Sequence, residues 1–402
     1  MPSPPNTICF LRPPPERDQF GVLDAGTQVY AGAFVKQGFT ARFLRTGKAD
    51  TAKELTGLLK DPQIAAVYSL GGWGGNAMVK TRQGMRSAFA HFGKPLICHH
   101  GDYPFTPWVE DKVRRDFPGK FVFHNDTGTP DLVHRMMRVR GHHGHANSAY
   151  YDYRYSPEAR AIPPKDRPIP LLYVGKHTGL SEWRPAIKQR WPDRLAMFEK
   201  IVERGIDDVF TPIWDITAAI MAEEGREFDL KDKATFHVLF LANDAIQSTR
   251  RERLLAKLVH HPVHIIVSRG EVPTLKHANA KYVKGQSFAE VLTLIEQSRA
   301  VVISQPNFSS GITERILTAM HRRAVVLSTT NGLIDQLFEA DQHYLQLRPD
   351  FANLDEQVGR LADGHLTTRL SEQAWRTVAR NHSPESVVAK YLATLRAADV
   401  AI

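Results

Sequence analysis

The sequence predicts an α/β protein with two Rossmann-like, doubly wound domains that face a cleft, the second of them carrying a helical insertion. Three observations lead to this prediction. Short apolar runs alternate with helix-length segments along nearly the whole chain, as in folds with largely parallel sheets. A stretch rich in His, Tyr and Pro, residues 140–170, interrupts this pattern and is typical of a connection between domains. The length of 402 residues suits two domains.

The first domain is expected to span residues 1–165. Five apolar runs in this part have the length and composition of buried strands, and the segments between them are long enough for crossover helices. We expect strands at 7–12, 40–45, 64–70, 94–100 and 120–125, and helices at 22–37, 50–60 and 76–92.

The second domain is expected to span residues 166–385 and to repeat the same alternation. Residues 184–234 hold mostly helical patterns between two expected strands, which is longer than an ordinary crossover and indicates an inserted helical lobe. A terminal helix follows over 386–402, with Ser383 as its cap and Glu385 close behind. The expected strands lie at 171–179, 236–244, 263–270, 281–285, 300–304 and 324–329.

Composition narrows the classes of protein. The 42% hydrophobic and 24% charged content is that of an ordinary globular protein. Its two cysteines, Cys9 and Cys98, are too few for a disulfide framework, so a reducing compartment fits best. The N-terminus has no apolar signal region, and no apolar run approaches the roughly 20 residues of a membrane span. We therefore expect a cytoplasmic protein without a transmembrane segment.

The formal net charge of +9 raises nucleic acid as a partner. The Lys and Arg residues are scattered among acids and form no single block, which disfavours this partner. A modest positive excess suits an anionic small substrate or an anionic membrane surface equally well.

The stretch NFSSGITERILTAMHRRAVVLST, residues 307–329, predicts an anion site. A helix from about residue 312 follows Ser309, Ser310 and Gly311, whose small size leaves backbone N–H groups accessible at a positive helix end. The alternative is that Ser310 only caps the helix and Gly311 only packs. Glu314 lies near the same helix start, where its carboxylate could accept hydrogen bonds from sugar hydroxyls or simply face solvent.

A resemblance to a known family rests on this stretch and its surroundings. The run SRAVVISQPNFSSGITERILTAMHRRAVVLSTTNGLIDQLFE resembles the donor-binding segment of glycosyltransferases with the GT-B fold, and most closely a bacterial group with an "ER" helix and an Ala-Met pair. The likeness continues in IPLLYVGKHTG, RRERLLAKLVHHPVHIIVSRG, KYVKGQSFAEVLTLIEQSRA and NHSPESVVAKYL. The first domain matches more weakly, through SLGGWGGN and FGKPLICHHGDYPF.

This resemblance implies that a nucleotide-sugar lies on the second domain, with its diphosphate held by Lys176 and the loop of Ser309, Ser310 and Gly311. It also implies ribose contacts from Glu314, a retaining outcome, and no dependence on a cofactor or bound metal. Related families have a glutamate where this chain has Thr318. Because charge develops on the leaving diphosphate, the expected donors are the N–H groups of Gly311 and Ile312, with Lys176 and Arg250 as cations.

Three further motifs suggest other chemistry. GWGGNA at 72–77 formally fits a dinucleotide fingerprint, but it is not on the first strand and no acid follows at the usual spacing. HHGDYP places His99, His100 and Asp102 at a strand end, where one of them could orient or deprotonate an acceptor hydroxyl. The alternative there is a packed histidine and a turn-capping acid. The cluster His142, His143 and His145 lacks the spacing of a structural zinc site.

The sequence therefore predicts a glycosyltransferase that moves a sugar from a nucleoside diphosphate donor to a protein, lipid or glycan acceptor. Two alternatives remain open: a nucleotide-sugar epimerase of the same fold, and a noncatalytic nucleotide- or nucleic-acid-binding protein.

Overall fold

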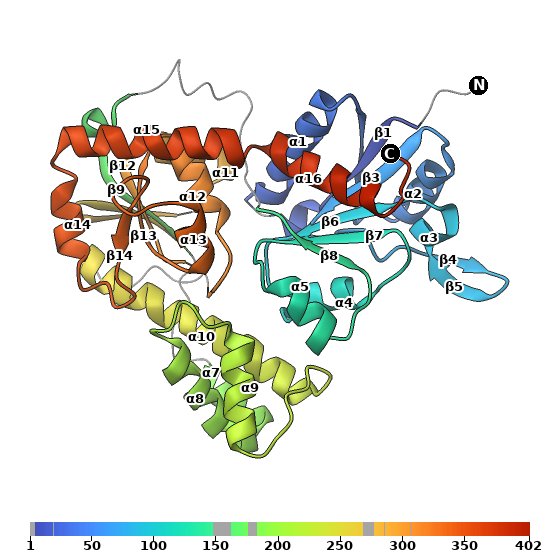
Figure 1. Cartoon of the computed structure of the whole chain (residues 1–402), viewed down its shortest axis with the longest axis horizontal. Helices are drawn as coiled ribbons and strands as arrows, with labels where there is room; N and C mark the ends of the chain where they lie inside the picture. Colours follow the sequence, from blue (N-terminus) through green and yellow to red (C-terminus); the bar gives the residue numbers. More distant parts are fainter. Residues whose placement is uncertain are drawn as a thin grey trace. The chain divides into compact units, whose positions relative to one another are not determined.

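The computed structural model describes residues 5–18, 20–147, 162–175, 183–267, 277–284, 286–305 and 307–402. Contacts divide the chain into two compact units: unit 1 is Met1–Tyr155 with Asn381–Ile402, and unit 2 is Ser156–Arg380. Each unit contains one six-stranded parallel sheet with helices packed on it (Figure 1). The predicted pair of α/β domains is confirmed.

Unit 1 is built on a sheet of order β2-β1-β3-β6-β7-β8. All seven residues of β3 are buried, as expected for a strand near the centre of a sheet covered on both faces. Its strands are β1 (Thr7–Arg12), β2 (Thr40–Arg45), β3 (Ile64–Leu70), β6 (Leu96–His100), β7 (Lys120–His124) and β8 (His142–His145), with a separate hairpin of β4 (Met78–Thr81) and β5 (Gly84–Ser87). Its helices are α1 (Val22–Lys36), α2 (Thr51–Lys60), α3 (Ala88–Phe92), α4 (Pro107–Arg114), α5 (Thr129–Asp131) and α16 (Pro384–Ala397).

The terminal helix α16 packs on α1 in unit 1. Tyr391 of α16 is fully buried, and its ring lies 4.4 Å from that of Phe123 on β7. The Ser383 hydroxyl accepts a hydrogen bond from the Ser386 backbone N–H at 3.2 Å, so the predicted cap is confirmed. The last segment of the chain therefore completes the core of the unit that the N-terminus begins.

Two expectations for unit 1 are wrong. Residues 76–92 form the β4–β5 hairpin and the short helix α3 rather than one helix, because glycines with positive φ precede the segment and Gly84 turns the hairpin. Residues 142–145, read as part of a connection, form the edge strand β8. Its His142 ring stacks on Phe121 at 4.6 Å, its partner on β7, so a histidine-rich segment without an apolar pattern forms this strand.

Unit 2 has a sheet of order β11-β10-β9-β12-β13-β14, all parallel. Leu171, Ile265, Val302 and Leu327 of its central strands join one apolar cluster with the end of α10. The strands are β9 (Ile169–Gly175), β10 (Val263–Val267), β11 (Ala280–Lys284), β12 (Ser298–Ile303), β13 (Val325–Thr329) and β14 (Leu345–Leu347). The helices are α7 (Trp183–Arg190), α8 (Leu195–Gly205), α9 (Ile213–Glu223), α10 (Lys233–Leu258), α11 (Phe288–Glu296), α12 (Glu314–His321), α13 (Gly332–Leu337), α14 (Leu354–Arg360) and α15 (Gly364–Asn381).

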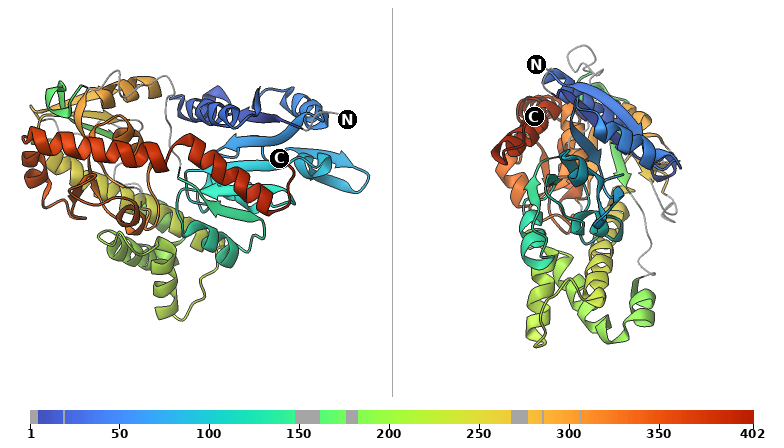
Figure 2. Two further views of the ribbon diagram at one scale, coloured as in Figure 1. Left: turned by 45° about the horizontal axis from the view of Figure 1, so that its top comes forward. Right: turned by 90° about the vertical axis from the view of Figure 1, so that its right-hand side faces the viewer.

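The strand expected at 236–244 is wrong, because these residues lie inside the 26-residue helix α10. The Asp232 carboxylate caps that helix by accepting from the N–H groups of Ala234 and Thr235. Buried positions such as Leu239, Ala242 and Ile246 then recur at helical spacing. The first half of α10 packs with α7, α8 and α9, and Figure 2 shows these green and yellow helices projecting from the unit 2 sheet.

None of the helices in the described ranges is both long and apolar enough to cross a membrane.

Candidate functional site

The strand order of unit 2 marks where a ligand is expected. The first strand, β9, lies at the centre, and the chain runs outward to β10 and β11 on one side and to β12, β13 and β14 on the other. Ligands of such sheets bind beyond the carboxyl ends of the strands at this reversal, which here lies between β9 and β12. The loop after β12 holds Ser309, Ser310 and Gly311 at this point. Lys176, which follows β9 directly, lies outside the described residues.

Asn331, which follows the neighbouring strand β13, holds this loop through hydrogen bonds. Its side-chain amide donates to the carbonyl oxygens of Phe308 and Gly311 at 2.8 and 2.7 Å, and the Gly332 N–H donates to the Ser309 carbonyl at 3.0 Å. The C=O and N–H of a trans peptide point in opposite directions. The N–H groups that follow these carbonyls therefore point away from Asn331, and they belong to Ser309, Ser310 and Ile312.

The helix α12 starts later than expected. It begins at Glu314 with Thr313 in the N-cap position, and Ser310 lies outside it. No side chain caps the first turn, because the Thr313 hydroxyl donates instead to the Glu314 carboxylate at 3.0 Å. The alternative role of Ser310 as a helix cap is therefore wrong. The expected apolar face is confirmed, since Ile312, Ile316, Ala319 and Met320 are buried.

Three buried polar atoms near this loop have no hydrogen-bond partner in the described part of the chain. They are Ser309 Oγ, Thr318 Oγ1 and Gln305 Oε1. Buried polar groups are nearly always satisfied in folded proteins, so atoms of this kind are informative. A polar ligand would supply the missing partners.

Arg250 is buried, and its guanidinium forms hydrogen bonds to other groups of the protein. Its guanidinium donates to the carbonyl oxygens of Gly205, Ile206 and Asp208 at 2.6, 2.7 and 2.8 Å, and to Asn307 Oδ1 at 3.0 Å. Arg250 thus ties the end of α8 to the loop after β12. This arrangement favours a positioning role over direct contact with a phosphate.

Two arginines that were not predicted from the sequence lie at the carboxyl end of β9. The Arg315 guanidinium donates to the Val174 carbonyl at 2.7 Å, and Arg251 of α10 is only 8% exposed. Burial lowers the pKa of Arg251, and the nearby charge of Arg315 adds to this shift, whereas Tyr173 and Asp244 oppose it. Arg251 has no carboxylate within 4 Å among the described residues, and the closest acid to Arg315 is Glu314 at 3.8 Å.

Tyr173 of β9 shows where Arg251 and Arg315 lie, because both charges act on it. Its buried hydroxyl lies so close to Gly175 that a Cβ there would come within 2.4 Å of it, which explains the glycine. Burial raises the pKa of Tyr173, and the charges of Arg251 and Arg315 oppose this shift. Two like charges gathered beside one strand end favour a bound anion.

The predicted catalytic residues of unit 1 lie at the end of β6 and just after it: His99 and His100 are its last two residues, and Asp102 follows. His99 is fully buried: its Nδ1 hydrogen-bonds the Tyr391 hydroxyl, and its Nε2 lies 2.8 Å from Asn125 Oδ1. Burial lowers the His99 pKa to about 4. With both ring nitrogens engaged in the core, His99 fits the alternative of a packed histidine.

Of the two histidines, His100 is the stronger candidate for contact with an acceptor. Both of its ring nitrogens are buried without a hydrogen-bond partner in the described part of the chain, and burial holds its pKa well below the usual value. The loop after β3 passes directly over it, since a Cβ on Gly72, at φ +69°, would lie 2.7 Å from the ring. His100 is therefore neutral at pH 7, and its burial and lowered pKa make the ring a weaker proton acceptor than a free imidazole.

Lys112 of α4 lies beside His100 and was not singled out from the sequence. Its ammonium donates to the Gly71 carbonyl at 2.7 Å and lies 3.9 Å from the centre of the Trp73 ring. Burial lowers the Lys112 pKa to about 8. Asp102 is exposed and accepts a hydrogen bond from the Trp108 indole at 2.9 Å. His100, Lys112 and Asp102 therefore gather at the carboxyl ends of β3 and β6.

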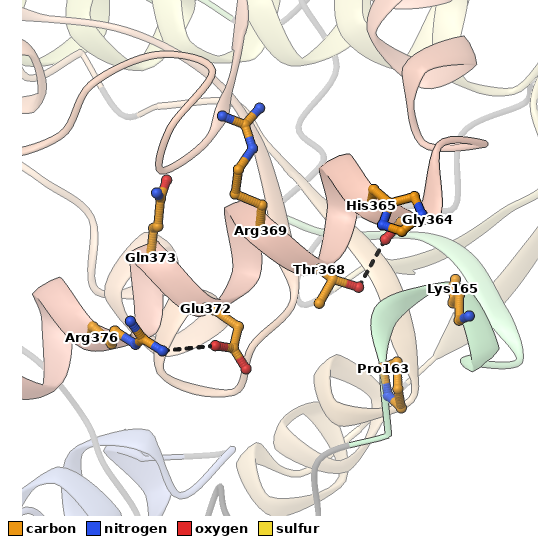
Figure 3. A pocket seen from close by; sticks show the side chains of 9 residues that line it. All are labelled: Pro163, Lys165, Gly364, His365, Thr368, Arg369, Glu372, Gln373 and Arg376. Carbon is orange, nitrogen blue, oxygen red and sulfur yellow. Dashed lines mark hydrogen bonds and ion pairs between the residues drawn. The ribbon is translucent and has the colours of Figure 1, made fainter.

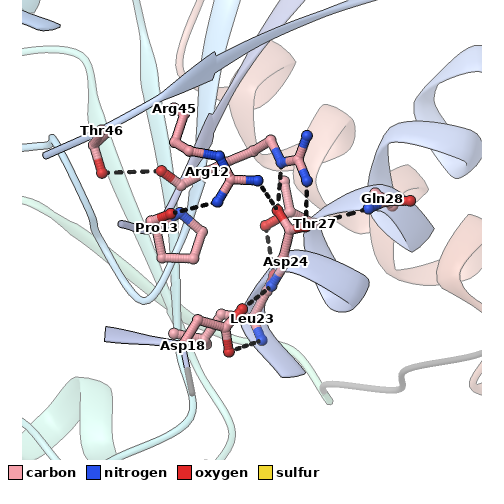
Figure 4. Close-up of polar contacts among 9 residues, drawn as sticks. All are labelled: Arg12, Pro13, Asp18, Leu23, Asp24, Thr27, Gln28, Arg45 and Thr46. Atoms are coloured by element: carbon pink, nitrogen blue, oxygen red, sulfur yellow. Dashed lines mark hydrogen bonds and ion pairs between the residues drawn. The ribbon is translucent and has the colours of Figure 1, made fainter. Parts of the chain in front are cut away.

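A carboxylate of the protein itself occupies the anion-binding position at the N-terminus of α1. Asp18 accepts hydrogen bonds from the N–H groups of Leu23 and Asp24 at 3.1 and 2.7 Å (Figure 4). The Asp24 carboxylate in turn pairs with Arg12 and Arg45, and the bond from Arg12 lowers its pKa. The anion-binding end of this helix and the two nearby cations are therefore satisfied within the protein.

Two competing motifs do not gain support. The glycines of GWGGNA lead into the β4–β5 hairpin rather than a helix, so the context of a dinucleotide fingerprint is absent there. Within the described ranges, no three or more His, Cys, Asp or Glu side chains form a group that could hold a metal ion. His142 and His143 belong to β8, where they pack on Phe121 and His124.

Comparison with known proteins finds a family model that matches part of the chain. Residues 250–393 match a family model described as glycosyl transferase-like. No curated protein sequence matches the chain.

The similar solved structures share the fold at low identity. An alpha-glucosyltransferase in complex with UDP-glucose and DNA containing an abasic site has a TM-score of 0.55 at 10% identity, covering 97% of this chain and 99% of that one. Sucrose-phosphate synthase from Thermosynechococcus elongatus gives 0.53 at 10%, covering 98% and 100%. HepE from Anabaena in complex with UDP-glucose gives 0.52 at 9%, covering 98% and 100%. The predicted GT-B fold is confirmed, and the glycosyltransferase class is confirmed at the level of the matched domain.

Proposed function

Because residues 250–393 form a glycosyl transferase-like domain within a GT-B fold, we propose that the chain transfers a sugar from a nucleoside diphosphate-sugar to an acceptor held by unit 1. UDP-glucose is the first donor to test, since it is bound in two of the similar structures. The nucleotide-sugar lies at the carboxyl edge of the unit 2 sheet, between β9 and β12.

The observation that carries this proposal is the pair Arg251 and Arg315 at the end of β9. Among the described residues Arg251 has no carboxylate within 4 Å, and Asp244 acts on it only from further away. A buried arginine of this kind, next to a second arginine, favours a bound anion, which a diphosphate would supply. The loop at Ser309 adds backbone N–H groups directed away from Asn331 and a buried hydroxyl with no hydrogen-bond partner among the described residues. Together these groups suit a ligand that is both strongly anionic and rich in hydrogen-bond acceptors.

The same groups would act in the reaction. Negative charge accumulates on the diphosphate as the bond to the sugar breaks, and donors that are already oriented stabilise it without reorganisation. Arg250 positions Asn307 and the loop after β12. Glu314, half-buried at the start of α12, would accept hydrogen bonds from the ribose, and Lys176 would add a further cation as the resemblance implies. The retaining outcome rests on the same resemblance.

On the acceptor side, His100 is the proposed base or orienting group, with Asp102 and Lys112 beside it. Its imidazole is neutral, and neither ring nitrogen has a hydrogen-bond partner in the ranges that the structure describes, so it is available to an acceptor, whereas His99 packs in the core. A cytoplasmic location accords with Cys9 and Cys98, which are both free and buried.

The test is to incubate the chain with a panel of UDP-, GDP- and ADP-sugars and to measure release of free nucleoside diphosphate. Slow hydrolysis or transfer supports the proposal. An altered sugar that stays attached to its nucleotide identifies an epimerase instead, and nucleotide binding without turnover identifies a noncatalytic binding protein. Arg253→Gln on α10, which removes an exposed salt bridge to Asp207, serves as the control for loss of a positive charge.

A further inference from the structure

A neutral side chain, Gln247, supplies a hydrogen-bond acceptor to Arg251. The Arg251 Nη2 donates to Gln247 Oε1 at 3.0 Å. The two residues are four apart on α10, so Gln247 lies one helical turn before the arginine on the same face. Gln247 is half-buried and Arg251 is buried. The guanidinium is therefore held by a group that carries no charge.

Two other arginines of unit 2 pair with carboxylates. Glu372 and Arg376 of α15 have the same spacing of four residues, and the Arg376 guanidinium donates to the Glu372 carboxylate at 3.1 Å (Figure 3). Arg322, which is also buried, forms an ion pair with Glu296. The amide on α10 therefore provides the hydrogen bond of such a pair without its compensating charge.

The charges around Arg251 do not replace that missing carboxylate. Asp244, also on α10, acts on Arg251 only from beyond 4 Å, and its carboxylate accepts a hydrogen bond from the Trp183 indole at 3.3 Å. Arg315 adds a second positive charge nearby. A buried charge without a close counterion costs free energy in the ligand-free protein, and an anionic ligand offsets that cost when it binds.

We propose that Gln247 is a positioning residue of the donor site, which orients the Arg251 guanidinium for the diphosphate and leaves its charge available to that ligand. This inference rests on the proposed function, because it requires the diphosphate at the end of β9. The amide already holds one N–H of the fork, so less side-chain freedom is lost when the other N–H groups meet phosphate oxygens. A carboxylate at the same place would hold the fork equally well but would also neutralise it. The amide therefore lowers the stability of the ligand-free protein and raises its affinity for an anion.

Gln247→Glu tests this inference, because it keeps the acceptor and adds the missing charge. The melting temperature without ligand should rise, since the buried guanidinium gains a counterion. The dissociation constant for UDP, measured by calorimetry, should rise at least about tenfold, because the new carboxylate compensates the guanidinium and repels the diphosphate. Gln189→Glu makes the same change at an exposed position on α7 and should leave both quantities unchanged.

Gln247→Met separates orientation from charge, since it keeps the length of the side chain and removes the acceptor. UDP affinity should fall about three- to tenfold, as expected for the loss of one hydrogen bond. Unchanged UDP affinity in this variant overturns the positioning role. A Gln247→Glu variant with unchanged affinity does so too, as does one that loses affinity and melting temperature together, because that pattern indicates a purely structural side chain.

Arg251→Gln, titrated with UDP in parallel, tests the donor placement itself. Unchanged affinity in this variant shows that the donor is placed wrongly and overturns both proposals. Lost affinity in Arg251→Gln, combined with unchanged affinity in Gln247→Glu and Gln247→Met, keeps the donor site and contradicts the role of Gln247 alone.

Discussion

The Arg250 guanidinium donates to Asn307 Oδ1 at 3.0 Å while its other nitrogens bind three backbone carbonyls at the end of α8. One buried side chain therefore joins the helical insertion to the loop that is proposed to hold the donor.

Arg250→Lys is expected to lower the free energy of unfolding by about 2–4 kcal/mol, because an ammonium cannot replace the guanidinium fork and carbonyl groups lose their donor. Denaturant unfolding measures this change, with Arg253→Lys as the matched control on the exposed side of α10. Full stability combined with lost nucleotide affinity would contradict a positioning role and would instead support direct donor contact, as the sequence predicts.

Ser309→Ala should leave stability unchanged or slightly raised, since it removes a buried hydroxyl without a partner in the described part of the chain. Nucleotide affinity should fall about tenfold in calorimetric titration. Ser298→Ala is the control, because that hydroxyl donates to the Leu294 carbonyl at 2.6 Å: it should lose stability and keep nucleotide affinity. Equal affinity of Ser309→Ala and the intact chain would remove Ser309 from the site.

The two histidines at the end of β6 should differ in their effects. His99→Gln is expected to lower the melting temperature, since the ring bonds both Tyr391 and Asn125 in the core. His100→Gln and Asp102→Asn should slow transfer with unchanged donor affinity, by about 10²-fold for His100 if it is the base. Turnover that survives both of these changes would place the acceptor group elsewhere.

Unit 1 should lose stability in mild acid. Burial lowers the pKa of several of its histidines below the unfolded value near 6.5, so the unfolded chain binds protons that the folded chain does not. Stability is then complete above pH 6.5 and falls as the pH drops toward the folded values, by about 1.4 kcal/mol per pH unit for each such group. These histidines are His99, His145 and His382, with pKa about 4, and His143, with pKa about 3.

Melting temperatures measured between pH 7.5 and 4.5 test this expectation. His145→Gln should flatten the pH dependence, because one group no longer differs between the folded and unfolded chain. A melting temperature that is constant over this range would contradict the assignment of neutral buried histidines.

The sequence predicted the parts of the fold in which local pattern and tertiary role agree. Strands such as β3 and β13 are continuous apolar runs, and the cap at Ser383 is a local signal. Residues 236–244 were misread because a short apolar run does not distinguish a strand from a buried helix, and the deciding cap at Asp232 lies before the run. The edge strand β8 was missed because histidines replace its apolar side chains.

Only those parts of the candidate site that are formed by residues close together in the sequence could be predicted. The small residues at 309–311 follow a strand directly, so their place at its carboxyl end could be expected. Arg251 of α10 and Arg315 of α12 come together only because both side chains reach the end of β9 in the folded chain, which no sequence spacing reveals. The engagement of Arg250 with α8 is likewise a product of tertiary packing.

Calorimetric titration of UDP into the intact chain and into the double variant Arg251→Gln, Arg315→Gln tests the central claim most directly. The account predicts a dissociation constant at least about 100-fold higher in the double variant, because two charge-assisted contacts to the diphosphate are lost. Its melting temperature without ligand is measured alongside, because the double variant removes one like-charge repulsion and also the hydrogen bond from Arg315 to the Val174 carbonyl. Unchanged UDP affinity in the double variant would contradict the placement of the donor at the end of β9.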